Sequence, residues 1–271
     1  MKPLLAAALL CLPPGLAVAA PDLPPALKAS GTLKVAVTPN YPPLEFRDPA
    51  TNALTGFDVG LAEALAAKLG VKLEWQESGF EAMLPALQTG RVDAIISGMS
   101  DLASRHEASS FVDYLRSGPQ FFVQQSRAGE FKDMAALCGH TVGTSRRTSF
   151  PSEIAAWSSS HCGDKPVTVV GTEGSGDART QLKQGRIDAA VQGSETLPYV
   201  MGQEPKAYAP VGAAFGTQYT GIAVAKTDVA VRDALVAALD ALIADGSYKA
   251  LLDKWQLSSD GVEKATVDAG R

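Results

Sequence analysis

The sequence predicts an α/β protein built from two similar lobes, and two observations lead to this class. First, short apolar segments alternate with amphipathic helical patterns along the 271 residues, which is typical of mostly parallel sheets flanked by helices. Second, the segment LQTGRVDAIISGMS (87–100) recurs as LKQGRIDAAVQGSE (182–195). Each copy predicts a helix end, a glycine cap and a buried strand that ends in small polar residues.

The first lobe begins with alternating strands and helices. Segment 57–69 places its apolar residues on one helical stripe, and Gly70 ends the helix. Gly90 ends the next helix in the same way. The elements expected here are strand 33–37, helix 57–69, strand 71–75, helix 81–89 and strand 92–96.

The end of the chain returns to the first lobe. A strand at 221–225 is followed by a long amphipathic helix over 229–244 and a shorter one over 247–255. A chain that crosses twice between lobes, near 118–124 and 212–219, forms a hinge. The expected division is lobe 1 over 31–119 plus 217–258, lobe 2 over 120–216, a tether over 20–30 and a C-terminal tail over 259–271.

The N-terminus predicts a secretory signal peptide over residues 1–19. Lys2 precedes an apolar core (Leu4–Leu12), and Ala17-Val18-Ala19 is a small-residue cleavage site. Export leaves Cys138 and Cys162, and an even pair in an oxidising compartment favours a disulfide over two buried free thiols. The mature protein is expected in the periplasm.

Composition and missing motifs exclude several function classes. The net charge is −5 without a long basic run, which argues against nucleic-acid binding. The sequence contains no P-loop, GxSxG, HExxH or dinucleotide fingerprint. The three histidines are scattered, so we expect no metal site and no cofactor. An exported two-lobed chain with a polar cleft is therefore interpreted as a binding protein and not an enzyme.

Several ordered motifs resemble family 3 of the extracytoplasmic solute-binding proteins. They are GFDV (56–59), DAIISGMS followed by Arg105, FVDY (111–114), and DGSY (245–248) with a later KW (254–255). The resemblance implies the periplasmic-binding-protein fold, type 2, with a two-crossover hinge. It also implies a monomer that binds an amino acid or related small carboxylate for an ABC importer, with the membrane permease as partner. The segment LCGHTVG resembles a subgroup that carries the Cys138–Cys162 disulfide.

The resemblance assigns ligand-binding roles to named positions. Arg105 is the clamp for the ligand carboxylate, because a planar guanidinium makes bidentate contacts. Thr148 and Ser149 open a helix whose free N–H groups hold the same carboxylate. The other expected ligand-binding residues are the aromatic pair Tyr41 and Phe80, and the strand-end residues Ser97, Gly98 and Ser100.

Departures from the family pattern concern the charges of the ligand. Gly193 stands where relatives carry the ammonium-binding aspartate, and Arg146 and Arg147 add positive charge. At Thr38 there is no acidic residue of the type that binders of basic amino acids use for a side-chain cation. Either the ligand has no α-ammonium group, which these departures favour, or a carboxylate replaces the missing one. Glu195 and Asp101 are the candidates for that replacement, but the position of Glu195 fits a charge at a helix N-terminus at least as well.

Two other functions stay open for this fold. One is an enzyme that resembles cyclohexadienyl dehydratase, with Glu195 as general acid or base. The other is a periplasmic sensor or an accessory subunit.

Overall fold

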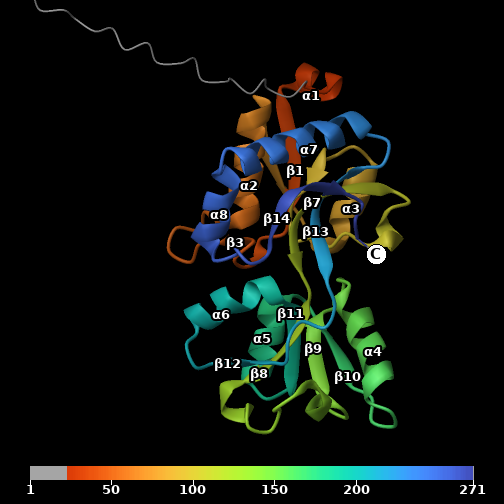
Figure 1. Cartoon of the computed structure of the whole chain (residues 1–271), viewed down its shortest axis with the longest axis vertical. Coiled ribbons are helices and arrows are strands. Elements are labelled where there is room, and N and C mark those ends of the chain that lie inside the picture. The colour runs from red at the N-terminus through yellow and green to blue at the C-terminus, as the bar shows by residue number, and fades with distance from the viewer. Residues whose placement is uncertain (1–22, 271) are drawn as a thin grey trace, which may run out of the picture.

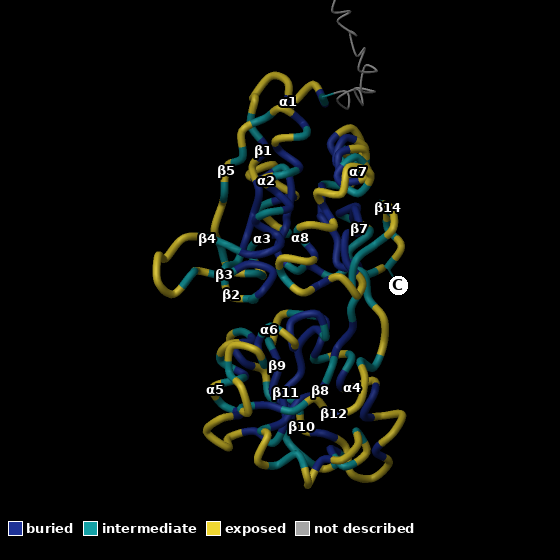
Figure 2. Tube along the Cα trace, turned by 60° about the vertical axis from the view of Figure 1, so that its left-hand side comes forward, coloured by how far each residue is buried: buried dark blue, intermediate teal, exposed yellow. Residues whose placement is uncertain are grey.

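The chain forms two lobes joined by two extended crossings, as Figure 1 shows. The structure is a computed structural model that describes residues 23–270. The predicted signal peptide lies outside the described residues. Each lobe has its own sheet and its own buried core, and the buried segments in Figure 2 gather separately in the two lobes.

Lobe 1 contains a six-stranded sheet in the order β14-β7-β13-β6-β1-β5. These strands are β1 (Thr32–Val37), β5 (Lys72–Glu77), β6 (Ala94–Ile95), β7 (Ser109–Ser117), β13 (Gln218–Ala225) and β14 (Gly261–Val267). A small sheet of β2 (Asn40–Tyr41), β3 (Glu45–Arg47) and β4 (Leu54–Thr55) follows β1.

Helices cover both faces of the lobe 1 sheet. One face packs against α1 (Pro25–Ser30), α2 (Phe57–Leu69), α7 (Val229–Ala244) and α8 (Ser247–Trp255). The other face packs against α3 (Phe80–Gln88) through Met83 and Leu87. The predicted bounds of α2, α7 and α8 agree with the structure, because their apolar stripes and end signals are local features.

Lobe 2 contains a five-stranded sheet in the order β10-β9-β11-β8-β12. Its strands are β8 (Pro119–Gln124), β9 (Thr141–Ser145), β10 (Thr168–Thr172), β11 (Ala189–Gly193) and β12 (Tyr208–Val211). α4 (Phe150–His161) packs on one face. α5 (Ser175–Lys183) and α6 (Leu197–Gln203) pack on the other. The described 3₁₀ turns are η1 (Ala103–Arg105), η2 (Gln125–Arg127), η3 (Met134–Leu137) and η4 (Ser194–Thr196).

The sheets are mixed, whereas the sequence predicted mostly parallel ones. β1 pairs in parallel with β5 and β6, but β13 runs antiparallel to β6 and β7. In lobe 2, β9 pairs in parallel with β10 and β11, and β8 is antiparallel to β11 and β12. The antiparallel strands lie next to the crossings, where a chain that leaves a lobe and returns must reverse direction.

Both terminal segments contain secondary structure that the sequence did not predict. The segment expected as a tether, 20–30, contributes α1, whose Leu27 is buried in the lobe 1 core. The segment expected as a tail, 259–271, contributes β14, which pairs with β7 at the sheet edge. Neither segment shows a strong local pattern, so tertiary packing decides both.

The two crossings approach each other closely. β7 passes through Gly118 into β8, and the loop after β12 passes through Gly216 into β13. A Cβ atom built on Gly118 would lie 2.1 Å from the Gly216 carbonyl oxygen. A side chain at residue 118 is therefore excluded at this crossing.

The Cys138–Cys162 disulfide is present. It joins the segment before β9 to the end of α4, with 5.2 Å between the Cα atoms. Across residues 23–270, the helices include none with the length and apolar character that crossing a membrane requires.

Candidate functional site

A cleft of about 220 Å³ separates the two lobes at the ends of their strands. The repeated segments meet here as predicted: Ser97, Gly98 and Ser100 line it from lobe 1, and Val191 and Gln192 line it from lobe 2. The carboxyl ends of parallel strands are the usual ligand-binding edge of such sheets.

Eight of the ten predicted ligand-binding residues line this cleft. They are Tyr41, Phe80, Ser97, Gly98, Ser100, Arg105, Thr148 and Ser149. Gly193 and Glu195 do not line it within the described part of the chain. Both instead contact the hydroxyl of Tyr41, which forms part of the cleft wall.

Arg105 projects from the turn η1 into the cleft. Its Nη1 donates to the Ser100 carbonyl at 2.6 Å, and its Cζ lies 5.9 Å from the centre of the Phe80 ring. Partial burial lowers the pKa of Arg105, although a guanidinium stays protonated. Among residues 23–270, no carboxylate forms an ion pair with this guanidinium. It therefore offers free N–H donors.

The start of α4 faces the cleft from lobe 2. Thr148 precedes the helix, and its hydroxyl accepts from the Phe150 N–H at 3.3 Å. The Ser149 hydroxyl is buried and has no partner in the described structure. The first N–H groups of a twelve-residue helix attract anions. A carboxylate in the cleft would thus meet donors from both lobes.

Arg146 and Arg147 also line the cleft, but both have acidic partners. Arg146 forms an ion pair with Glu173 at 2.6 Å within lobe 2. Arg147 pairs with Glu81 across the cleft, so this ion pair joins the two lobes. The cleft is therefore less cationic than the arginine count suggests.

Tyr41, in the wall of the cleft, joins the two lobes. Its hydroxyl donates to Glu195 Oε1 at 3.0 Å and accepts from the Gly193 N–H at 3.0 Å. A Cβ atom built on Gly98 would lie 3.0 Å from the Tyr41 ring, so the ring packs directly on the backbone of a glycine in the left-handed region.

Glu195 occupies the space that a side chain at residue 193 would need. A Cβ atom on Gly193 would lie 2.1 Å from Glu195 Oε1 and 2.2 Å from Oε2. The carboxyl is buried, and Oε2 has no hydrogen-bond partner in the described structure. Burial raises the pKa of Glu195 to about 7.

Glu45 also lines the cleft, although no sequence pattern pointed to it. Its Oε1 accepts from the Ser97 hydroxyl at 2.9 Å, while Asp58 Oδ2 accepts from the Gly98 N–H at 2.7 Å. The Glu45 and Asp58 carboxyls lie within hydrogen-bonding reach of each other. Each has one oxygen without another partner in residues 23–270.

A proton held between the two carboxyls would satisfy these oxygens. Burial, followed by the neighbouring Asp58, raises the pKa of Glu45 well above its usual range, and burial raises that of Asp58 to about 6. The pair holds two of the strand-end residues that line the cleft, Ser97 and Gly98. An isolated acid in the segment YPPLEF carries no periodic signal, so only the fold reveals this role.

The sequence matches the profile of the bacterial extracellular solute-binding proteins, family 3, over residues 33–258. It is 31% identical to the L-arginine-binding protein of Pseudomonas aeruginosa over 238 residues, which covers 85% of this chain and 90% of the relative. It is 28% identical to the histidine-binding periplasmic protein of Salmonella typhimurium over 231 residues, with coverages of 82% and 86%.

Solved structures show the same architecture. An ancestral arginine-binding protein bound to arginine superposes with a TM-score of 0.75 at 31% identity, covering 83% of this chain and 98% of that one. The ancestral amino acid-binding protein AncCDT-1, a precursor of cyclohexadienyl dehydratase, gives a TM-score of 0.76 at 27% identity, with coverages of 85% and 97%. Fold, strand-end cleft and profile agree, and the chain belongs to the bacterial extracellular solute-binding proteins of family 3.

Proposed function

We propose that this solute-binding protein captures a free α-amino acid between its lobes and delivers it to an ABC permease. The observation that carries the proposal is that hydrogen-bond donors face the cleft from both sides. On one side is Arg105, which has no acidic partner in residues 23–270. On the other is the start of α4 with the Ser149 hydroxyl, which has no partner in the described structure. Arg105 belongs to lobe 1 and α4 to lobe 2. A ligand carboxylate held by both stabilises the closed arrangement, because the open one loses half of these contacts.

Glu195 is our candidate for the ammonium partner. Its carboxyl fills the side-chain space of Gly193 and contacts Tyr41, which lines the cleft. This position supports the second alternative raised by the sequence, in which a carboxylate replaces the missing aspartate. Asp101, the other candidate, is buried against His106 and the Gly270 N–H. For a ligand ammonium to reach Glu195, the Tyr41 side chain must move away from that carboxyl.

Arginine is the first ligand to test. The relatives named above bind arginine or histidine by name. Glu45 brings a buried carboxyl to the cleft wall, and its Oε2 has no hydrogen-bond partner among the described residues. Buried acids near an aromatic ring suit a cationic side chain, because they neutralise its charge away from water.

Three related probes separate the contacts. L-arginine carries both α-groups, agmatine lacks the carboxylate, and 5-guanidinopentanoate lacks the ammonium. By calorimetry on the mature protein, we expect L-arginine to bind most tightly and agmatine to lose at least about thirtyfold, since a charge-assisted bidentate contact is worth about 2 kcal/mol. Equal binding of agmatine and L-arginine would remove Arg105 from the carboxylate role. Failure of all twenty amino acids in a thermal-shift screen would end the proposal.

We propose binding without turnover, and prephenate tests this directly. The structural similarity to a dehydratase precursor and the buried Glu195 make it the relevant substrate. Incubation with the mature protein should leave prephenate intact, whereas formation of phenylpyruvate that disappears in Glu195→Gln would establish the enzyme instead.

We also propose that the chain reaches the periplasm as a monomer after cleavage behind Ala19. N-terminal sequencing of periplasmic material should begin at Ala20. Light scattering should report a single chain.

A further inference from the structure

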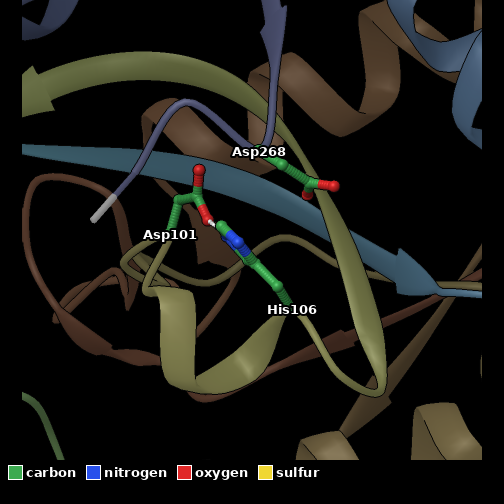
Figure 3. Close-up of side chains that lie close together, drawn as sticks. All are labelled: Asp101, His106 and Asp268. Carbon is green, nitrogen blue, oxygen red and sulfur yellow. Dashed lines mark hydrogen bonds and ion pairs between the residues drawn. The ribbon is translucent and has the colours of Figure 1, made fainter.

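Residues 266–270, near the C-terminus, pack against the loop that carries Arg105. We call Thr266–Gly270 the C-terminal strap and Ser100–His106 the arginine loop. The strap lies beyond the family match, which ends at residue 258. Figure 3 shows its Asp268 beside Asp101 and His106 of the arginine loop.

The strap is attached by a series of hydrogen bonds. Asp268 Oδ1 accepts from the Phe111 N–H at 2.7 Å, and the Asp268 N–H donates to the Phe111 carbonyl at 3.1 Å. Asp113 Oδ2 accepts from Thr266 Oγ1 at 2.9 Å and from the Ala269 N–H at 3.3 Å. Phe111 and Asp113 belong to β7, so the strap is fixed to the lobe 1 sheet.

Asp101 connects the strap to the arginine loop. Its Oδ2 accepts from the Gly270 N–H at 2.6 Å, and its Oδ1 contacts His106 Nε2. Asp101 and His106 thus close the loop on either side of the turn that carries Arg105. Asp101 is only 1% exposed. A buried carboxylate needs such partners to remain in place.

The contact at Gly270 leaves no room for a side chain. A Cβ atom there would lie 2.0 Å from the Asp101 carbonyl oxygen and 2.6 Å from its Cγ. Any larger residue must displace the strap or the start of the arginine loop. This backbone contact is therefore specific for glycine.

The side chains at this contact do not form a convincing metal site. Asp101, His106 and Asp268 place one ligand atom each within 4.8 Å of one another. However, the second Asp268 oxygen is paired with Lys226 at 3.0 Å, and Figure 3 shows the Asp268 carboxylate turned away from the imidazole. The oxygens of both acids are used by protein groups, which indicates a structural junction.

We propose that Asp101 and the C-terminal strap are positioning elements that hold the arginine loop, so that Arg105 points into the cleft before a ligand arrives. This rests on the proposed carboxylate-binding role of Arg105. Asp101, which the sequence made a candidate for ammonium binding, then has a different function. A loop set in advance saves the ordering cost at the moment of binding.

The first test needs no ligand. Amide hydrogen exchange over 101–106 should be at least about tenfold faster in Gly270→Ala than in the wild type, because the Asp101 contact is lost. Gly129→Ala is the matched control, since a Cβ there meets nothing within 4 Å. Removal of residues 266–271 is the second variant if Gly270→Ala does not fold. Unchanged exchange in both would overturn the proposal even if no amino acid binds.

The second test links the loop to binding. With L-arginine as probe, Asp101→Asn should raise Kd about tenfold in the wild type but less than about twofold in an Arg105→Lys background. A merely structural role would cost the same factor in both backgrounds and would refute positioning. Asp164→Asn, at an exposed site in lobe 2, should leave Kd unchanged. If the wild-type protein binds no amino acid, the proposed function fails. The hydrogen-exchange experiment alone then decides whether Asp101 and the C-terminal strap position the arginine loop.

Discussion

Replacement of Glu195 by glutamine should change how stability depends on pH. The carboxyl is buried at the lobe interface, where burial raises its pKa from an ordinary 4.5 to about 7. The folded protein therefore binds a proton more tightly than the unfolded chain does. The stabilisation is fully present below about pH 4.5 and is lost as the pH rises to about 7.

The magnitude follows from the shift. Each pKa unit corresponds to about 1.4 kcal/mol. The difference in the Glu195 pKa between the folded and unfolded states therefore predicts that the free energy of unfolding falls by about 3 kcal/mol between pH 4.5 and 7.5. Glutamine keeps an acceptor for the Tyr41 hydroxyl but cannot ionise. Glu195→Gln should remove this part of the loss, so that the variant gains on the wild type as the pH rises.

Urea denaturation at half-unit pH steps measures the effect. The difference in unfolding free energy between wild type and Glu195→Gln should change by about 3 kcal/mol across this range. The comparison cancels the other buried acids, Glu45, Asp58 and Asp113, which titrate in both proteins. Exposed Glu173→Gln is the control and should run parallel to the wild type. Parallel curves for Glu195→Gln would show that Glu195 is not buried in the free protein.

Three further changes have defined outcomes. Arg105→Lys should weaken L-arginine binding about thirtyfold by calorimetry, because lysine lacks the planar guanidinium that makes two parallel contacts. The control Arg116→Lys, at an exposed position, should not weaken binding. An equal effect of both changes would contradict the role of Arg105 as the carboxylate clamp. L-arginine affinity should increase from pH 5.5 to 8, since Glu195 must lose its proton to hold an ammonium. This rise should be smaller in Glu195→Gln, where the Glu45–Asp58 pair still titrates, and an equal rise in both proteins would exclude Glu195. Replacing Cys138 and Cys162 by serine should lower the unfolding free energy by about 3 kcal/mol for a separation of 24 residues, and equal melting temperatures of oxidised and reduced protein would contradict this.

The sequence alone determined most of the local structure. Helices over 57–69, 229–244 and 247–255 have the predicted bounds, because apolar spacing and end signals act within a few turns. The internal repeat placed two strand ends at one cleft, and the structure confirms this through Ser97 and Gln192. The predicted export and an even cysteine count led to the disulfide that is present.

Tertiary structure decided the charges of the cleft and the ends of the chain. The Glu195 carboxyl lies in the space beside Gly193 and contacts Tyr41, which is 154 residues away in the sequence. The acids that pair with Arg146 and Arg147 also come from other segments. The strap residue Gly270 meets Asp101 across 169 residues. Such contacts have no periodic signature, because they depend on how the lobes and the sheet edge are assembled. Burial then sets the pKa of each acid, and no sequence pattern reports burial at a single polar residue.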